Sequence, residues 1–253
     1  MELLGKTSKL AAHVRKLLAS AQYRRECSQY VCEGTKLLFD AAKSGADIAA
    51  VIHTPGTELP ELDSKVDVRA ASEELLKSLS TQKTPQGAIF VCNMKQREKS
   101  SEGGFRIILD GVQDPGNVGT VLRSAEAFGV KEVLLAPGCA DPYLYKTARA
   151  SMGSVFRQSF ASLTHGELKA LKEEQGLVYV AADAGGDASF DDIPWDKCAV
   201  IIGSEGRGPS KEMLSVSDRI LSIPMQGSCE SLNAAIAATV VMWEYIRRKT
   251  EGK

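Results

Sequence analysis

Hydrophobic residues in the second half of the chain form short continuous runs, separated by longer stretches with helical spacing. The runs FRIILD (105–110) and CAVII (198–202) predict strands that are buried on both faces. Residues 117–128, 167–174 and 231–248 space their apolar residues as helices do. The alternation of such strands and helices predicts an α/β fold with a mostly parallel sheet covered on both faces.

Four further runs predict the remaining strands of this sheet. They are KEVLLAP (131–137), VFRQSFA (155–161), LVYVAAD (177–183) and DRILSIPM (218–225), and a short helix is expected at residues 145–152. No internal repeat or low-complexity tract interrupts the series.

The first part of the chain carries a shorter version of the pattern. Helices are expected near 8–19, 34–43 and 72–79, and strands near 29–32, 47–53 and 87–92. The stretch NMKQREKSSEGG (93–104) is polar, charged and ends in glycines, so it reads as a linker. We therefore expect a small α/β domain over residues 1–95, a linker over 96–104 and a larger domain over 105–253.

Composition fits a globular protein and disfavours several other classes. Of the 253 residues, 43% are hydrophobic and 25% charged, and no run approaches the roughly 18 apolar residues of a membrane span. The first residues, MELLGKTSKL, lack the apolar core of a secretion signal. The six cysteines include no C-x-x-C pair and the three histidines lie far apart, so we expect no metal site. We expect reduced thiols and a cytoplasmic location, with an organellar matrix left open.

The distribution of charge says more than the net charge of −1. Up to Lys43 there are eight basic and four acidic residues, a local excess of four positive charges. Such an excess can follow a phosphate backbone. A solvated helix face explains it as well, and the charge count alone favours that simpler reading.

Three loops at the expected carboxyl ends of strands carry unusual chemistry. They are DGVQDPGNVGTVLRSAEAFG (110–129), IIGSEGRGPS (201–210) and SIPMQGSCESLNAAIAA (222–238). Ligands of open parallel sheets bind at this edge. The glycines of the first loop lack G-x-G-x-x-G spacing, and the next strand ends without an acid, which disfavours a dinucleotide site. No G-K-[ST] follows Gly116 or Gly208, so a P-loop fails too.

Taken together and in this order, the three loops resemble the signature motifs of the SpoU (TrmH-like) RNA ribose 2'-O-methyltransferases of the SPOUT class. The matching residues are Asn117 and Arg123 in the first motif, Glu205 in the second, and Ser231 and Asn233 in the third. The segment YVCEGTKLLFDAAKSG (30–45) resembles, less specifically, the opening of the small RNA-binding domain of many members, which is similar in fold to ribosomal protein L30e.

The resemblance implies a trefoil-knotted α/β sheet, S-adenosyl-L-methionine as cofactor, RNA as partner and a homodimer. The final helix, 231–248, suits either a dimer interface or burial within one subunit. The family assigns the deprotonation of the ribose 2'-hydroxyl to the arginine that matches Arg123. Because arginine stays protonated in proteins, we favour a role in which Arg123 grips the adjoining phosphate and aligns the hydroxyl.

The resemblance also assigns the other site residues. Asn117 is expected at the start of a helix, and Glu205 is expected to pair with Arg123 or Asn117. The residues expected to line the RNA site beside Arg123 are Asn117, Glu205, Ser231 and Asn233. The residues expected to hold the cofactor, largely through backbone groups, are Gly203, Ile223 and Leu232. Pro209 stands where many members carry an aliphatic residue or methionine, and we expect it in a first helical turn, where proline is tolerated.

The favoured function is methylation of a ribose 2'-hydroxyl in large-subunit ribosomal RNA, because the extra N-terminal domain favours ribosomal over transfer RNA. A transfer-RNA 2'-O-methyltransferase is one alternative. The other is a non-catalytic RNA-binding protein of the same fold that acts in ribosome assembly or shields an antibiotic site. The complete set of polar motif residues argues against the non-catalytic alternative.

Overall fold

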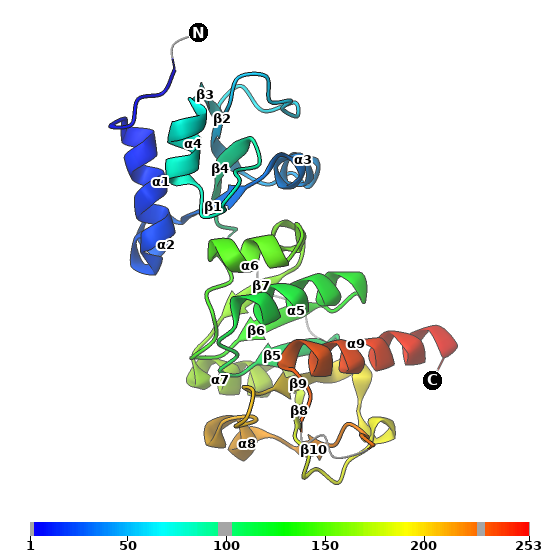
Figure 1. The fold of residues 1–253 in the computed structure, drawn as a ribbon. Helices are drawn as coiled ribbons and strands as arrows, with labels where there is room; N and C mark the ends of the chain where they lie inside the picture. The colour runs from blue at the N-terminus through cyan, green and yellow to red at the C-terminus, as the bar shows by residue number, and fades with distance from the viewer. Residues whose placement is uncertain (1–2, 96–102, 227–230, 253) are drawn as a thin grey trace. The chain divides into compact units, whose positions relative to one another are not determined.

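The computed structural model describes residues 3–95, 103–226 and 231–252, which form two compact units (Figure 1). The first unit contains residues 3–95 and 141–157, and the second contains residues 103–140, 158–226 and 231–252. No helix in the described ranges is long and apolar enough to cross a membrane.

The first unit is built on a four-stranded mixed sheet. Its order is β1 (Gln29–Glu33), β4 (Ala88–Asn93), β2 (Ile48–His53) and β3 (Asp67–Ala70), with β4 antiparallel to both of its neighbours. Its first helices are α1 (Lys9–Ala19), α2 (Ala21–Cys27), α3 (Thr35–Lys43) and α4 (Glu73–Leu79). The apolar faces of α1 and α4 pack on the sheet, where Val14, Leu17 and Leu75 are almost wholly buried.

Residues 141–157 pack within the first unit although they follow the first strands of the second. This segment contains α6 (Tyr145–Ala150) and the 3-10 turn η1 (Ser154–Phe156). Asp141 accepts two hydrogen bonds from the guanidinium of Arg24 on α2, at 2.6 and 3.1 Å, and Arg24 is only 4% exposed. The first unit is therefore packed from residues that lie on both sides of the expected linker in the sequence. That linker lies mostly outside the described residues, and the expected linear boundaries stay a prediction.

The second unit contains a six-stranded sheet in which every pair of neighbouring strands is parallel. Its order is β10 (Arg219–Leu221), β8 (Val178–Ala182), β9 (Cys198–Ile202), β5 (Arg106–Leu109), β6 (Glu132–Leu135) and β7 (Phe160–Ser162). Every residue of β5, β6 and β9 is buried, as the continuous apolar runs predict. The predicted α/β class with a mostly parallel sheet is confirmed.

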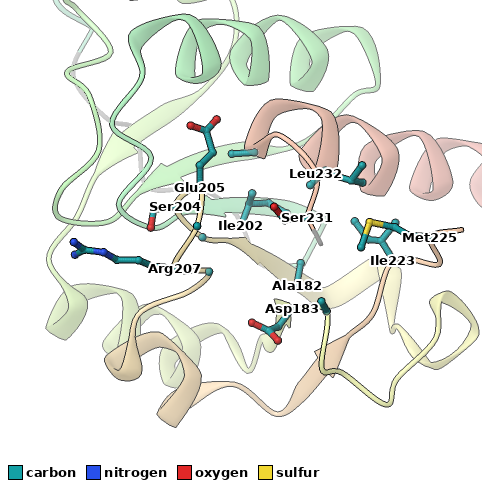
Figure 2. Close-up of a pocket in the computed structure, with 16 residues that line it drawn as sticks. Ala182, Asp183, Ile202, Ser204, Glu205, Arg207, Ile223, Met225, Ser231 and Leu232 are labelled. Atoms are coloured by element: carbon teal, nitrogen blue, oxygen red, sulfur yellow. The ribbon is translucent and has the colours of Figure 1, made fainter. Parts of the chain in front are cut away.

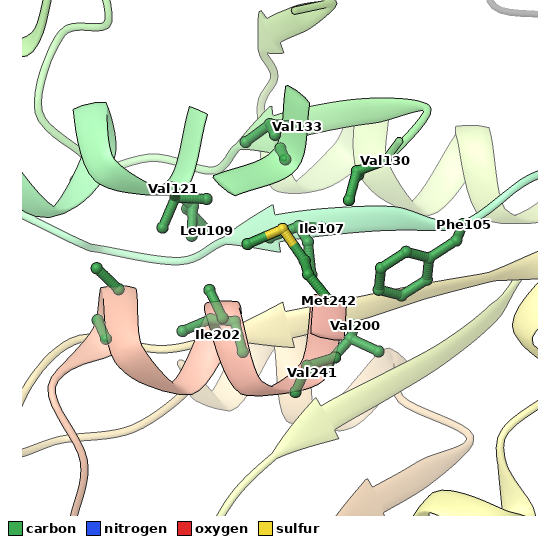
Figure 3. Close-up of a cluster of buried hydrophobic side chains, with 14 of the residues drawn as sticks. Phe105, Ile107, Leu109, Val121, Val130, Val133, Val200, Ile202, Val241 and Met242 are labelled. Atoms are coloured by element: carbon green, nitrogen blue, oxygen red, sulfur yellow. The ribbon is translucent and has the colours of Figure 1, made fainter. Parts of the chain in front are cut away.

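Helices cover both faces of this sheet. On one face α5 (Pro115–Ala127) and α9 (Ala234–Glu251) lie side by side (Figure 1), and their apolar residues meet Ile107, Leu109 and Val200 in the cluster of Figure 3. On the other face α7 (His165–Gln175) and α8 (Lys211–Val216) pack against Ile108 and Ile201. Successive residues of β5 and β9 thus point to opposite cores, as the pleat requires. Two 3-10 turns, η2 (Phe190–Asp192) and η3 (Trp195–Lys197), precede β9.

Some element boundaries differ from the predictions. The predicted strand 155–161 begins inside η1, and β7 starts only at Phe160. The last helix starts at Ala234, because the side chain of Asn233 caps it by accepting the N–H groups of Ala235 and Ile236, at 3.0 and 3.2 Å. The short elements α2, β3 and α8 were not predicted.

A buried ion pair joins the amino ends of two central strands. Arg106 of β5 and Glu132 of β6 are paired in the sheet register, both are fully buried, and their Nε and Oε2 atoms lie 3.6 Å apart. The remaining guanidinium N–H groups donate to the carbonyls of Gly103 and Gly104 and to the side chain of Gln175, at 2.7 to 3.1 Å. Removing either side chain would therefore leave the other buried charge without this ion pair.

We expect Arg106→Met to lower the free energy of unfolding by about 3–5 kcal/mol, because it removes the ion-pair partner of a fully buried carboxylate. The double variant Arg106→Met/Glu132→Leu should be more stable than Arg106→Met alone. Urea unfolding of the wild type, Arg106→Met, Glu132→Leu and the double variant measures the interaction energy between the two side chains. If the free-energy losses of the two single variants add up to the loss in the double variant, the two side chains do not stabilise each other and the prediction is wrong.

Candidate functional site

The loops that follow β5, β9 and β10 lie at one edge of the second unit's sheet, because all its strands run in the same direction. The loop after β5 leads into α5, whose first position is Pro115 and whose N-cap is Asp114. The Asp114 carboxylate accepts the backbone N–H of Asn117 at 2.9 Å. Asn117 therefore stands in the first turn of α5, as expected, but it does not cap the helix.

Three motif side chains form a closed triangle of hydrogen bonds. The side-chain amide of Asn117 donates to Glu205 Oε1. The amide of Asn233 donates to the same oxygen at 2.9 Å and to Asn117 Oδ1 at 3.1 Å. Because Asn233 Oδ1 is occupied in capping α9, only its NH₂ group is left to face the triangle. The three loops are thus joined by side chains that the sequence analysis assigned to one site.

The triangle also lies where two helices begin. Asn117 is in the first turn of α5 and Asn233 is the N-cap of α9, so the positive ends of both helix dipoles lie near the Glu205 carboxylate. The Glu205 carboxylate thus accepts hydrogen bonds from side chains at two helix starts.

The other two expected catalytic residues lie outside the triangle. Arg123 is on the exposed side of α5, and within the described residues it makes no hydrogen bond or ion pair. Of the two partners expected for Glu205, the structure pairs it with Asn117. Ser231 lines the neighbouring pocket, where Figure 2 shows it beside Ile202.

A pocket of about 330 Å³ lies at the carboxyl ends of β8 and β9. All three residues expected to contact the cofactor line it, namely Gly203, Ile223 and Leu232. Figure 2 shows the apolar side chains of Ile223, Met225 and Leu232 on one side of the pocket, and Ser204 and Arg207 on the opposite side.

The pocket suits a ligand with a flat apolar part and a polar part. Its volume falls within the range of about 300–1,000 Å³ that small-molecule sites occupy. Aliphatic side chains from the loop after β10 can cover a purine ring, while backbone groups of 203–208 and nearby carboxylates supply polar partners. S-adenosylmethionine has this chemical character, so the residues present fit it.

Gly203 lines the pocket and also has a structural role in its own loop. A Cβ atom at Gly203 would overlap backbone atoms of Gly208 and Pro209, so the missing side chain lets the loop fold back on itself. The N–H of Ser204 closes the turn by donating to the carbonyl of Gly208 at 3.1 Å. Pro209 is buried and precedes Ser210, the N-cap of α8, so the expectation that it occupies the first helical turn is wrong.

The sequence analysis missed Asp110, which connects two of the loops. Asp110 is 3% exposed, and its Oδ2 accepts the N–H of Ser210 at 2.6 Å while its Oδ1 lies 3.5 Å from His165 Nε2. Its position directly after a buried apolar strand was the available signal. The thiol of Cys139 donates to the carbonyl of Leu109 at the end of β5, and burial raises the pKa of this thiol to about 11, which disfavours the thiolate at neutral pH.

Comparisons with known proteins agree with this geometry. Residues 104–243 match the SpoU rRNA Methylase family, and residues 13–89 match the MRM3-like substrate binding domain. The chain is 32% identical over 235 residues to the 23S rRNA (guanosine(2553)-2'-O)-methyltransferase RlmP of Bacillus subtilis, which covers 90% of this chain and 92% of that protein.

Two solved structures are similar over almost the whole chain. A putative RNA methyltransferase of the TrmH family from Porphyromonas gingivalis is 31% identical with a TM-score of 0.85, covering 98% of this chain and 100% of the other. The SpoU methyltransferase AviRb from Streptomyces viridochromogenes, in complex with the cofactor AdoMet, is 26% identical with a TM-score of 0.88, covering 97% and 100%.

We expect Gly203→Ala to weaken the binding of S-adenosylmethionine by at least about 10-fold and to lower the free energy of unfolding by about 1–3 kcal/mol, because the loop must move to accommodate the methyl group. Calorimetric titration and urea unfolding measure the two effects. Gly166→Ala is the matched control, because Gly166 lies in α7 and a Cβ there meets only the Thr164 hydroxyl, at 3.9 Å. Unchanged cofactor affinity in Gly203→Ala would contradict the role given to this glycine.

Proposed function

Because the chain belongs to the SpoU rRNA methylase family, we propose that its triangle and pocket form the site at which a methyl group passes from S-adenosylmethionine to a ribose 2'-hydroxyl of large-subunit ribosomal RNA. The observation that carries the proposal is the triangle itself. It joins Asn117, Glu205 and Asn233, one residue from each motif, next to a pocket that fits the cofactor. The B. subtilis relative named above acts on 23S ribosomal RNA, which supports the choice of RNA.

The pocket residues would bind and orient the cofactor. Ile223 and Leu232 supply the apolar wall, and the backbone of Gly203 lies at the same pocket. When bound, S-adenosylmethionine supplies an electrophilic methyl group to the 2'-oxygen and leaves as S-adenosylhomocysteine, while the hydroxyl proton passes to water. The triangle keeps the loops of β9 and β10 in register with α5, so the cofactor and the RNA meet in a fixed geometry.

Arg123 would hold the RNA. Its guanidinium is exposed and has no partner among the described residues, so its planar fork is available to a phosphate. A phosphate held next to the reacting nucleotide fixes the direction in which the 2'-hydroxyl points. Ser231 at the pocket and Asn117 at the start of α5 would contact the ribose. A target that DNA lacks also explains the restriction to RNA.

The basic segment of the first unit would track the RNA backbone. Residues 6–25 contain six basic and no acidic residues. Arg24 is buried and hydrogen-bonded to Asp141, so its role is structural and it is not available to RNA. Lys9, Arg15, Lys16 and Arg25 remain exposed on α1 and α2. Charges of this kind contribute salt-dependent affinity without reading the sequence.

Two further features follow from family membership as proposals. A trefoil knot in the sheet of the second unit is proposed from membership of the family alone. The cytoplasmic location stays a prediction from the sequence.

A homodimer is proposed from the exposed side of α9. This helix buries Ala238, Val241 and Met242 against the sheet, but Ile236 and Trp243 are 54% and 55% exposed. These two residues are seven positions apart and so lie on the same side of the helix. Trp243 also meets Phe128 of the α5 end, with ring centroids 6.1 Å apart. An apolar surface over two adjacent helices is typical of a subunit interface.

We expect Arg123→Ala to lower methyl transfer by at least about 100-fold, because the RNA loses its alignment. Affinity for S-adenosylmethionine should not change, since Arg123 lies outside the pocket. The assay uses labelled cofactor with ribosomal and transfer RNA, and maps the product by its resistance to alkaline hydrolysis. Lys169→Ala, at an exposed position of α7, is the control. Full activity of Arg123→Ala on the natural RNA would overturn the assignment.

We expect Trp243→Glu to convert a dimer into monomers, because it places a charge in an apolar interface. Sedimentation velocity of the full chain measures the change. Val68→Glu, at a 40% exposed position of β3, is the matched control and should leave the dimer intact. A wild type that sediments as a monomer would rule out the proposed interface.

A further inference from the structure

Asp183 lines the pocket from the end of β8, and no specific contact has been assigned to it so far. It begins the sequence DAGG, in which an aspartate precedes two glycines. Its Oδ1 accepts the N–H of Gly185 at 2.9 Å, and its carbonyl accepts the N–H of Gly186 at 3.1 Å. These bonds form an Asx turn, in which the side chain is held by its own backbone.

The loop is also fixed against the neighbouring strand. The N–H of Asp183 donates to the Leu221 carbonyl at 3.0 Å. A Cβ atom at Gly186 would lie only 2.5 Å from the Ile220 carbonyl oxygen, so glycine is required for this close approach to β10. The carboxylate therefore has one orientation, set before any ligand arrives.

The second oxygen of this carboxylate, Oδ2, is not held by the Asx turn. Within the described ranges no residue hydrogen-bonds to Oδ2 or forms an ion pair with Asp183. Oδ2 lies against the loop after β9, because a Cβ atom on Gly208 would be 3.0 Å from it. Figure 2 places Asp183 and Glu205 on opposite sides of the pocket, and the Glu205 side chain extends away from Asp183.

We propose that Asp183 Oδ2 accepts a hydrogen bond from S-adenosylmethionine, either from the ribose hydroxyls or from the ammonium group of the methionine part. The inference rests on the proposed function, since it names a contact for that cofactor. Asp183 is half-buried at the pocket, and one of its oxygens is held by the Asx turn while the other can accept a hydrogen bond. The ribose and the ammonium group of the cofactor are both donors. A bond of this type to a charged acceptor is stronger than a neutral one.

The test compares wild type, Asp183→Asn and Asp187→Asn by calorimetric titration of the full chain. Asn at 183 keeps the oxygen that holds the Asx turn but replaces Oδ2 with an NH₂ group, which cannot accept. We expect affinity for S-adenosylmethionine to fall about 10-fold to 100-fold in Asp183→Asn. Asp187 is exposed in the same loop region and outside the pocket, so Asp187→Asn should bind as the wild type does.

Three ligands identify the donor. S-adenosylmethionine and S-adenosylhomocysteine carry the ribose and the ammonium group, whereas methylthioadenosine carries the ribose and lacks the amino-acid part. An equal loss of affinity for all three supports the ribose hydroxyls. A loss for the first two that spares methylthioadenosine supports the ammonium group. A loss of affinity for S-adenosylmethionine alone would overturn the proposal, because Asp183 would then interact with the sulfonium charge and not with a hydrogen-bond donor.

Kinetics supply a second readout. The KM for S-adenosylmethionine should rise by the factor found in the titration, while kcat at saturating cofactor stays within about two-fold, as for an interaction made equally before and during transfer. Unchanged affinity of Asp183→Asn for every ligand would refute the contact while leaving the methyltransferase assignment intact. A wild type that binds none of the three would refute the proposed function instead.

Discussion

One carboxylate oxygen, Glu205 Oε1, sets the geometry on which the rest of the site depends. It receives the amides of Asn117 and Asn233, which stand at the starts of the two helices that cover one face of the sheet. Asn233 also caps α9 through its Oδ1, which orients its NH₂ group toward Glu205. A carboxylate is suited to this place, since a neutral amide at 205 would present one acceptor oxygen without the charge that two helix N-termini favour.

The strands of the larger unit were predictable because their sequence signal is physical. A strand covered on both faces is mostly apolar, so β9 is a continuous apolar run, and β5 and β6 are apolar after the charged residue that begins each of them. The start of the last helix was not predictable from periodicity, because the apolar pattern continues past the residue that caps it. The sequence pattern also gave no sign that residues 141–157 pack within the first unit. This packing depends on a pair between Arg24 and Asp141, which are 117 positions apart in the chain.

The site followed from the sequence only in part. Resemblance of the three motifs located Asn117, Glu205 and Asn233, but it could not show that they bond to one another and leave Arg123 apart. Asp110 and Asp183 were missed, because neither stands out by residue type or spacing. Each gains its meaning from a partner far along the chain, Ser210 for Asp110 and the pocket wall for Asp183.

The glycines at the carboxyl edge of the sheet show that a glycine-rich loop after a strand can have a structural role. A glycine-rich turn after a strand suggests a phosphate or cofactor cradle. Here the tightest approaches are between parts of the protein itself, Gly203 against Gly208 and Pro209, and Gly186 against Ile220. These glycines let two loops fold closely enough to leave a pocket between them, and the pocket's chemistry comes from other residues, namely the aliphatic wall and the carboxylate of Asp183. A cofactor bound there needs no glycine fingerprint, which is why the usual nucleotide motifs are missing from a chain that carries an adenosine-sized site.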